Sequence, residues 1–199
     1  HDAPIEPQML LYYNGVGLIA SQALRPFDAR HDGSVFGEGA GALMLETEAS
    51  AVARHAEVLG EVLGGGSACE AEGLLTIRDD GDGVVRAIHQ ALEDAKLRPE
   101  DVGMIVARGN GTPQSDASEA AALRRVFGAA GPPVTAFKWS TGHLLAASGI
   151  LDVAVDALDS VSAGAFVGSL VAVTVLVAPP VMLLGAAAPY AIRLAVRTV

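Results

Sequence analysis

The chain has 199 residues, a formal net charge of −10 and a composition that is 51% hydrophobic but only 5% aromatic. This length and apolar content allow one domain with a sizeable core and exclude a disordered chain. Because acidic residues outnumber basic ones by 23 to 13, the sequence offers no broad basic surface, and no nucleic-acid partner is expected.

In the N-terminal part of the chain, the sequence predicts loops, two strands and one short helix. The letters YYNGVG at 12–17 indicate a turn or helix break, and the polar run at 25–33 indicates a loop. A glycine-rich turn then leads into a predicted strand at 41–46, and a short helix is expected at 48–56. The next run, EVLGEVLGGGSA at 57–68, predicts a second strand that ends in glycines.

The clearest predicted element is an amphipathic helix at 82–97, which Asp82 can cap. Its apolar side chains recur on one face at spacings of three and four: Val85, Ile88, Leu92 and Ala95. A second helix is expected further along, capped by Ser115 or Asp116 and stopped by Gly128.

Further strands are expected at 102–107 and 132–137, a loop at 138–143 and a buried helix of small residues at 144–158. Strands that alternate with helices through short links indicate a layered α/β domain. The pattern leaves the order of the strands open.

The C-terminal region differs in character from the rest of the chain. Residues 160–192 contain no Asp, Glu, Lys or Arg over 33 positions, more than the roughly 20 that span a bilayer. We therefore expect an α/β region at 1–155 and a hydrophobic helical tail at 156–199. The tail is a transmembrane helix, a hairpin broken at Pro179 and Pro180, or a buried pair of apolar helices.

Three loops carry motifs that a plain core would not need: RPFDARHDGSVFGEGAGALMLE at 25–46, RGNGTPQSDASE at 108–119 and KWSTGHLLAASG at 138–149. They resemble, in order and spacing, the runs RPFDxxRDGfvxGEGAGxLxLE, HGTGTPxxDxxE and KxxxGHxxxAxG of the β-ketoacyl synthase family. The resemblance covers about residues 1–152. It implies an α/β, thiolase-like fold, here the C-terminal lobe of a ketosynthase with an apolar helical tail.

The family condenses an acyl thioester with a malonyl thioester, which loses carbon dioxide. A cysteine carries the acyl chain, and two histidines stabilise the negative charge that develops on the malonyl thioester carbonyl. By resemblance His143 is the second histidine, and Lys138 and Glu119 are the lysine and glutamate that support it. Arg108 stands where the first histidine belongs, and an arginine stabilises negative charge but keeps its proton. Asn110 replaces a usual threonine.

Two features of the family find no match in this sequence. They are the nucleophilic cysteine in a TACSSS-like turn and the final loop NSFGFGG. The single cysteine, Cys69, is expected to be an ordinary buried or half-buried thiol. We therefore expect an incomplete ketosynthase half that is inactive alone. The tail resembles a membrane segment of spermidine synthase-like integral membrane proteins, joined here by gene fusion, by an assembly error or by engineering.

Each candidate residue also has a purely structural explanation. His143 can be a core histidine, and Lys138 can be a solvated loop lysine. Arg108 can be a surface arginine that pairs with Asp116 or Glu119. Glu119 can instead complement the dipole of a helix from its first turn.

The resemblance implies an acyl carrier protein as a partner, and a homodimer or a heterodimer with another ketosynthase subunit. No bound cofactor is expected, because the phosphopantetheine arm belongs to the carrier. No metal is expected at Asp28, His31 and Asp32, because no second cluster of ligands accompanies them. The location is cytoplasmic by resemblance, or at a membrane if 160–192 insert. The alternatives are a non-catalytic, chain-length-factor-like partner subunit and an inactive fusion fragment with a membrane tail.

Overall fold

The computed structural model describes residues 4–56, 58–70, 73 and 76–161. The chain divides into two compact units. One, which we call the site unit, comprises Glu6–Phe36 and Val62–His143 and contains every predicted site residue. The described residues of the other unit lie within His1–Ile5, Gly37–Glu61 and Leu144–Val199.

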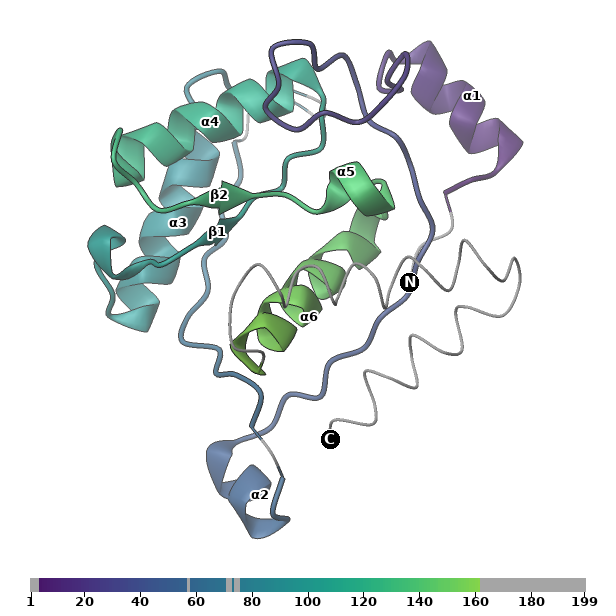
Figure 1. Cartoon of the computed structure of the whole chain (residues 1–199). Coiled ribbons are helices and arrows are strands. Elements are labelled where there is room, and N and C mark those ends of the chain that lie inside the picture. Colours follow the sequence, from purple (N-terminus) through teal and green to yellow (C-terminus); the bar gives the residue numbers. More distant parts are fainter. Residues whose placement is uncertain (1–3, 57, 71–72, 74–75, 162–199) are drawn as a thin grey trace. The chain divides into compact units, whose positions relative to one another are not determined.

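The site unit holds a β-α-β arrangement. Strands β1 (Ile105–Val106) and β2 (Val134–Thr135) are parallel, with Ile105 opposite Val134. Helix α4 (Pro113–Phe127) connects them, because parallel neighbours need a crossover, and α3 (Asp82–Ala95) packs against α4 (Figure 1). The strands expected at 102–107 and 132–137 are therefore confirmed in type, although each is shorter than predicted.

Helix α3 confirms the amphipathic pattern, but its cap differs from the prediction. Asp82 is the first helical residue, and Gly81 takes the capping position with a φ of 66°. The backbone N–H of Asp82 donates to Asp80 Oδ1 at 3.1 Å. The carboxylate of Asp80 thus satisfies one of the backbone amides in the first turn of the helix that have no partner within the helix.

Helix α4 begins earlier than predicted. Thr112 is its capping residue, and Pro113 occupies the first position, where a missing N–H costs nothing. Ser115 and Asp116 are therefore inside the helix, and both are buried. The helix ends at Gly128, which has a φ of 72°, as the glycine stop predicts.

The remaining helices are short, apart from two. Helix α1 spans Pro7–Gly15 and ends at the predicted YYNGVG break, and α6 spans Ser148–Val161. The others are α2, Glu48–Ala53, with the 3-10 turns η1, Pro99–Asp101, and η2, Leu145–Ala147. The loop expected at 138–143 is wrong in part, because Lys138–Thr141 form the helical turn α5. The backbone N–H of Ser140 closes that turn by donating to Phe137 O at 3.0 Å.

The strands predicted at 41–46 and 57–68 are not formed among the described residues. At 64–67 the chain lies along α3 instead, where Gly65 N donates to Asp94 Oδ2 and Ser67 N to Gln90 Oε1, both at 3.0 Å. Side chains of a helix therefore take the amides that a neighbouring strand would bond.

Residues 41–46 have the apolar pattern of a strand without a ladder partner among the described residues. Met44 and Leu45 are 74% and 73% exposed. A strand forms only where its backbone makes hydrogen bonds with a neighbouring strand, so the apolar pattern alone does not produce one here. Just before this run, a Cβ at Gly39 would lie 2.9 Å from Leu144 Cδ1, so the glycine permits close packing.

The predicted hydrophobic tail lies outside the described residues, except for the end of α6. Within the described part of the chain, no helix combines the length and the apolar character that crossing a bilayer requires. The transmembrane and hairpin alternatives for 160–192 thus stay predictions.

Candidate active site

The carboxyl ends of β1 and β2 bring two of the predicted site residues to the same edge. The backbone N–H of Ala107 donates to Thr135 O at 2.7 Å, which extends the pairing one residue beyond β1. Arg108 follows directly, and Lys138 begins α5 shortly after β2. Crevices at the carboxyl ends of parallel strands are common sites for ligands.

Glu119 holds the loop that carries Arg108. Its Oε1 accepts the backbone N–H of Arg108 at 2.7 Å, and its Oε2 accepts that of Gly109 at 3.0 Å. Glu119 lies in the second turn of α4, so the first-turn dipole explanation does not apply. Its carboxylate therefore holds the main chain of the loop and fixes the position of the Arg108 backbone.

Asp116 is a positioning residue that the motifs alone did not reveal. Its side chain is 1% exposed, and its Oδ1 accepts Gly111 N at 3.1 Å. Its Oδ2 accepts Phe27 N at 2.8 Å and lies 3.2 Å from His31 Nδ1. One buried carboxylate therefore ties the 25–33 loop to the loop after β1, although the residues are far apart in sequence.

Two glycines allow these loops to approach each other. Gly109 has a φ of 40°, and a Cβ there would lie 2.6 Å from the Cβ of Ala136. Gly111 has a φ of 80°, and a Cβ there would collide with the carbonyl oxygen of Gly33. Both the backbone angle and the space therefore favour glycine at these positions. Between them, Asn110 is buried, and its Oδ1 accepts Thr112 Oγ1 at 2.8 Å.

His143 is held by its backbone and by the face of its ring. Its N–H donates to Val35 O at 2.7 Å. Its imidazole stacks on Phe36 with 6.0 Å between ring centroids, and Phe36 stacks on the buried Tyr13 at 4.2 Å. The conformation of the 34–36 segment and of α1 thus determines where the imidazole lies.

Burial lowers the pKa of His143 from 6.5 to about 4, and the positive charges of Lys138 and Arg108 add to this effect. The imidazole is therefore neutral at physiological pH. A neutral imidazole donates a hydrogen bond without bringing a proton that must first be lost.

The pH dependence of His143 gives the first testable prediction. Its imidazole signals in an NMR titration should move with a midpoint near pH 4, far below 6.5. Because the unfolded chain binds this proton more tightly, His143 favours folding above pH 6.5, and this contribution is lost as the pH falls from about 6.5 to about 4. Arg108→Gln should raise the midpoint by removing a positive charge, whereas Arg124→Gln, on an exposed face of α4, should not. If the titration midpoint of His143 is the same in Arg108→Gln as in the unaltered chain, the guanidinium of Arg108 does not lie near His143.

Arg108 and Lys138 differ in their surroundings. Lys138 is 3% exposed, so the explanation as a solvated loop lysine is wrong. The side chain of Arg108 is exposed and makes no hydrogen bond or ion pair with Asp116, Glu119 or any other described residue. The predicted surface pairing of this arginine is therefore not formed in the described part of the chain.

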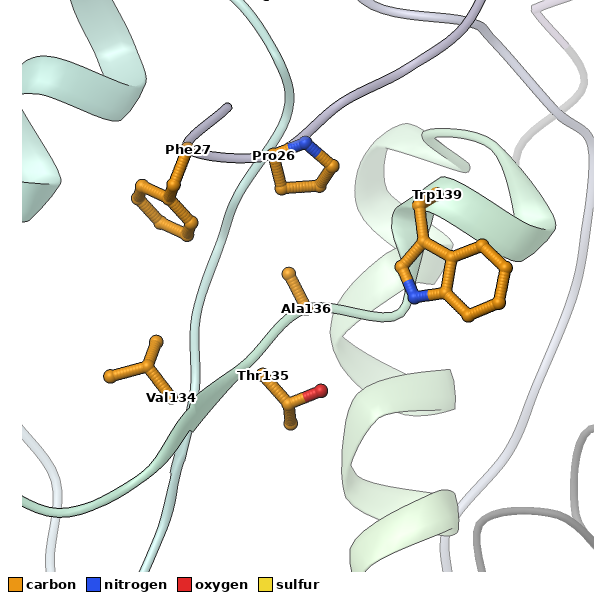
Figure 2. A pocket seen from close by; sticks show the side chains of 6 residues that line it. All are labelled: Pro26, Phe27, Val134, Thr135, Ala136 and Trp139. Atoms are coloured by element: carbon orange, nitrogen blue, oxygen red, sulfur yellow. The ribbon is translucent and has the colours of Figure 1, made fainter. Parts of the chain in front are cut away.

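An open hollow of about 210 Å³ adjoins the same loops. Figure 2 shows its six lining side chains, which come from the 25–33 loop, from β2 and the residue after it, and from the start of α5: Pro26, Phe27, Val134, Thr135, Ala136 and Trp139. Trp139 is 64% exposed. Five of the six lining residues have apolar side chains, and Thr135 adds a hydroxyl group.

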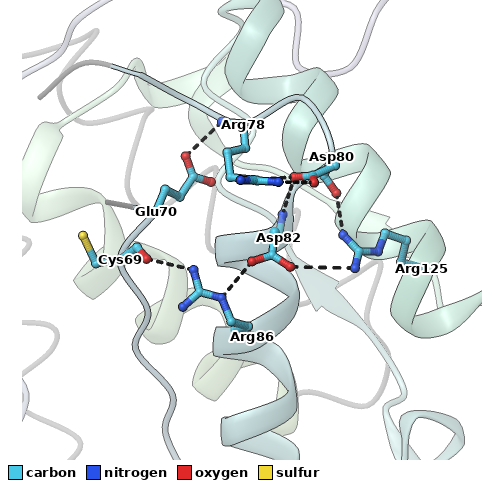
Figure 3. A network of polar contacts seen from close by, with 7 residues as sticks. All are labelled: Cys69, Glu70, Arg78, Asp80, Asp82, Arg86 and Arg125. Carbon is cyan, nitrogen blue, oxygen red and sulfur yellow. Dashed lines mark hydrogen bonds and ion pairs between the residues drawn. The ribbon is translucent and has the colours of Figure 1, made fainter. Parts of the chain in front are cut away.

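Cys69 is exposed, which corrects the expectation of a buried or half-buried thiol. Its carbonyl oxygen accepts Arg86 Nη2 at 2.8 Å, within a network that joins Cys69, Glu70 and residues 78–80 to α3 and α4 (Figure 3). In that network Arg86 Nε donates to Asp82 Oδ2 at 2.9 Å, and Arg125 Nη1 donates to Asp80 O at 2.9 Å. The main chain of Cys69 is fixed, and nothing in this network activates its thiol.

The three residues considered for a metal each have another partner. His31 faces Asp116, Asp28 pairs with Arg30 at 3.1 Å, and Asp32 accepts the hydroxyl of Ser21. Among the described residues, no group of three His, Cys, Asp or Glu side chains is arranged to hold a metal ion.

Two family models match the chain. "Beta-ketoacyl synthase, C-terminal domain" matches residues 59–167, and "Beta-ketoacyl synthase, N-terminal domain" matches residues 2–51. The 3-oxoacyl-(acyl-carrier-protein) synthase 2 of Synechocystis sp. is 44% identical over 129 residues, which are 64% of this chain and 31% of that protein. The synthase 2 of Staphylococcus aureus is 39% identical over 138 residues, 68% of this chain and 34% of that protein. The chain thus spans about a third of the length of these curated relatives.

Solved structures agree with these sequence relatives. The ishigamide ketosynthase/chain length factor has a TM-score of 0.75 at 35% identity, over 79% of this chain and 38% of its own. A type II PKS acyl-carrier protein in complex with its ketosynthase bound to the hexaketide has a TM-score of 0.76 at 32% identity, over 79% and 41%. These structures support the thiolase-like ketosynthase fold predicted from the motifs.

Proposed function

Because this chain belongs to the β-ketoacyl synthase family, we propose that it carries the part of a ketosynthase site that handles a malonyl thioester. The observation that carries this proposal is the neutral imidazole of His143, which stacks on Phe36 and lies within electrostatic reach of Arg108 and Lys138. The residues of the site are His143, Lys138, Arg108 and Glu119.

In the proposed reaction the bond between the malonyl carboxylate carbon and its α-carbon breaks. Carbon dioxide leaves, and the electron pair of that bond passes to the α-carbon and the thioester oxygen as an enolate. The imidazole N–H of His143 donates to that oxygen as its charge grows. Glu119 contributes by holding the main chain of the Arg108 loop, and Lys138 contributes a fixed positive charge from a buried position.

The enolate would then attack an acyl-cysteine and release the cysteine thiolate. Cys69 is not suited to this role, because its segment lies along α3, apart from the strand edge that carries Arg108 and Lys138. We therefore place the acyl-cysteine on a companion ketosynthase segment, and we propose an acyl carrier protein as the partner that presents the malonyl group. One relative of known structure is a ketosynthase in complex with its carrier protein, which supports this choice of partner.

Arg108 favours a second candidate function, that of a non-catalytic partner subunit. The family motif has histidine at this position, and an arginine cannot alternate between donor and acceptor roles. Such a subunit would shape the site of a catalytic ketosynthase without releasing carbon dioxide itself. One solved relative pairs a ketosynthase with a chain length factor, which supports this alternative.

The variant Arg108→His separates the two candidates. We expect carbon dioxide release from malonyl-carrier to rise by about tenfold or more, because a histidine restores a group that can serve in acid–base and donor roles. The assay uses the full chain co-expressed with the part of the S. aureus synthase that precedes its match, and Arg124→His is the matched control. A rise specific to Arg108→His supports the condensing site. Release that stays absent in every variant supports the non-catalytic subunit.

A further inference from the structure

Around the loop after β1, the acidic side chains bond the backbone, whereas the basic side chain of Arg108 is exposed. Both nearby carboxylates point at main-chain amides: Glu119 bonds Arg108 N and Gly109 N, and Asp116 bonds Gly111 N and Phe27 N. These acceptors therefore face the backbone of the loops. The guanidinium of Arg108 is exposed and finds no carboxylate among the described residues.

The second strand end adds another cation to this edge. Lys138 follows β2, lies at the same end of the strand pair as Arg108, and is buried. His143 lies in the field of both cations, which help to keep its imidazole uncharged. The candidate site therefore combines the exposed guanidinium of Arg108 with the nearby positive charge of Lys138, and this charge suits an anionic ligand better than a neutral acyl group.

We propose that Arg108 binds the free carboxylate of a malonyl-type thioester, so that this site selects carboxylated acyl groups and retains them. A guanidinium matches a carboxylate with two parallel N–H donors. The inference rests on the proposed function for its choice of thioester, but it concerns binding and not turnover.

The same contact slows loss of carbon dioxide. Decarboxylation converts the carboxylate into a neutral molecule, so a cation that stabilises the carboxylate stabilises the ground state more than the transition state. Arg108 thus lowers the dissociation constant of the malonyl group and raises the barrier to its reaction. A histidine at this position would hold the carboxylate less firmly.

Calorimetric titration of the full chain with malonyl-pantetheine and acetyl-pantetheine tests the proposal. We expect the malonyl compound to bind roughly ten- to a hundredfold more tightly, the range of a hydrogen bond to a charged group. Arg108→Gln should remove this preference, Arg108→Lys should keep part of it, and Arg124→Gln should keep all of it. Equal binding of the two thioesters by the unaltered chain overturns the proposal, as does a preference that survives Arg108→Gln.

A second variant separates this inference from the proposed function. His143→Ala should lower carbon dioxide release by about 10²- to 10³-fold while keeping the preference for the malonyl compound. If release depends on His143 but Arg108→Gln leaves the binding preference intact, the proposed function stands and the carboxylate site is wrong. If the preference depends on Arg108 but release never depends on His143, the carboxylate site stands and the proposed function is wrong.

Discussion

His143→Ala should lower carbon dioxide release from malonyl-carrier by about 10²- to 10³-fold, when the chain is co-expressed with the preceding part of the S. aureus synthase. This is the usual effect of losing one donor to a developing oxyanion. The imidazole is neutral at the pH of the assay because burial and two nearby cations lower its pKa to about 4. Alanine leaves the thioester oxygen without this donor. The rate of release of labelled carbon dioxide measures the effect directly.

The control for this variant is His89→Ala, which changes an exposed histidine on α3. It should leave the rate unchanged. Because the ring of His143 also stacks on Phe36, circular dichroism melts of both variants should accompany the rates. A folded His143→Ala chain that releases carbon dioxide at the original rate would remove His143 from the mechanism.

Asp116→Ala should lower the free energy of unfolding by about 3 kcal/mol, because it leaves one buried and one partly buried backbone donor without an acceptor. The two backbone N–H groups of Phe27 and Gly111 lose their partner, and His31 loses its contact. Alanine cannot reach any of the three. Urea unfolding followed by circular dichroism gives the measurement.

Two variants make this prediction specific. Asp28→Ala changes a carboxylate in the same loop, which among the described residues pairs with the neighbouring, exposed Arg30, and it should have a much smaller effect. Asp116→Asn keeps one acceptor oxygen and should fall between the two. A loss of stability from Asp116→Ala no larger than that from Asp28→Ala would show that the loops are held together by other contacts.

The elements that sequence reasoning placed well are those whose stability is local. The spacing of Val85, Ile88 and Leu92 is enough to indicate α3, because a helix makes its own backbone hydrogen bonds. The glycine at the end of α4 likewise marks its stop through its own φ.

The strands show where that reasoning fails. The runs at 41–46 and 57–68 have strand-like composition, but a strand depends on a neighbour that composition does not specify. Gly65 and Ser67 instead bond side chains of α3, and this alternative is visible only once the helix is in place.

The motifs indicated candidate site residues but not the contacts that these residues make. The motifs indicated Glu119 as a site residue, yet its attachment to the main chain at Arg108 and Gly109 depends on a distance across the loop. Asp116 was considered only as a helix cap or an arginine partner. Its real contacts, with Phe27 and His31, join residues 89 and 85 positions apart, which no local pattern encodes.

The loop after β1 is held through its main chain by Glu119 and Asp116, by two glycines with positive φ, and by the contact between Asn110 and Thr112. None of these contacts involves the side chain at position 108, so that side chain can change while the scaffold stays the same. Histidine and arginine codons can differ by a single nucleotide. If the roles proposed for this position hold, one nucleotide change would convert a carboxylate-retaining site into a decarboxylating one, and the chain would stay folded because the loop does not depend on this side chain.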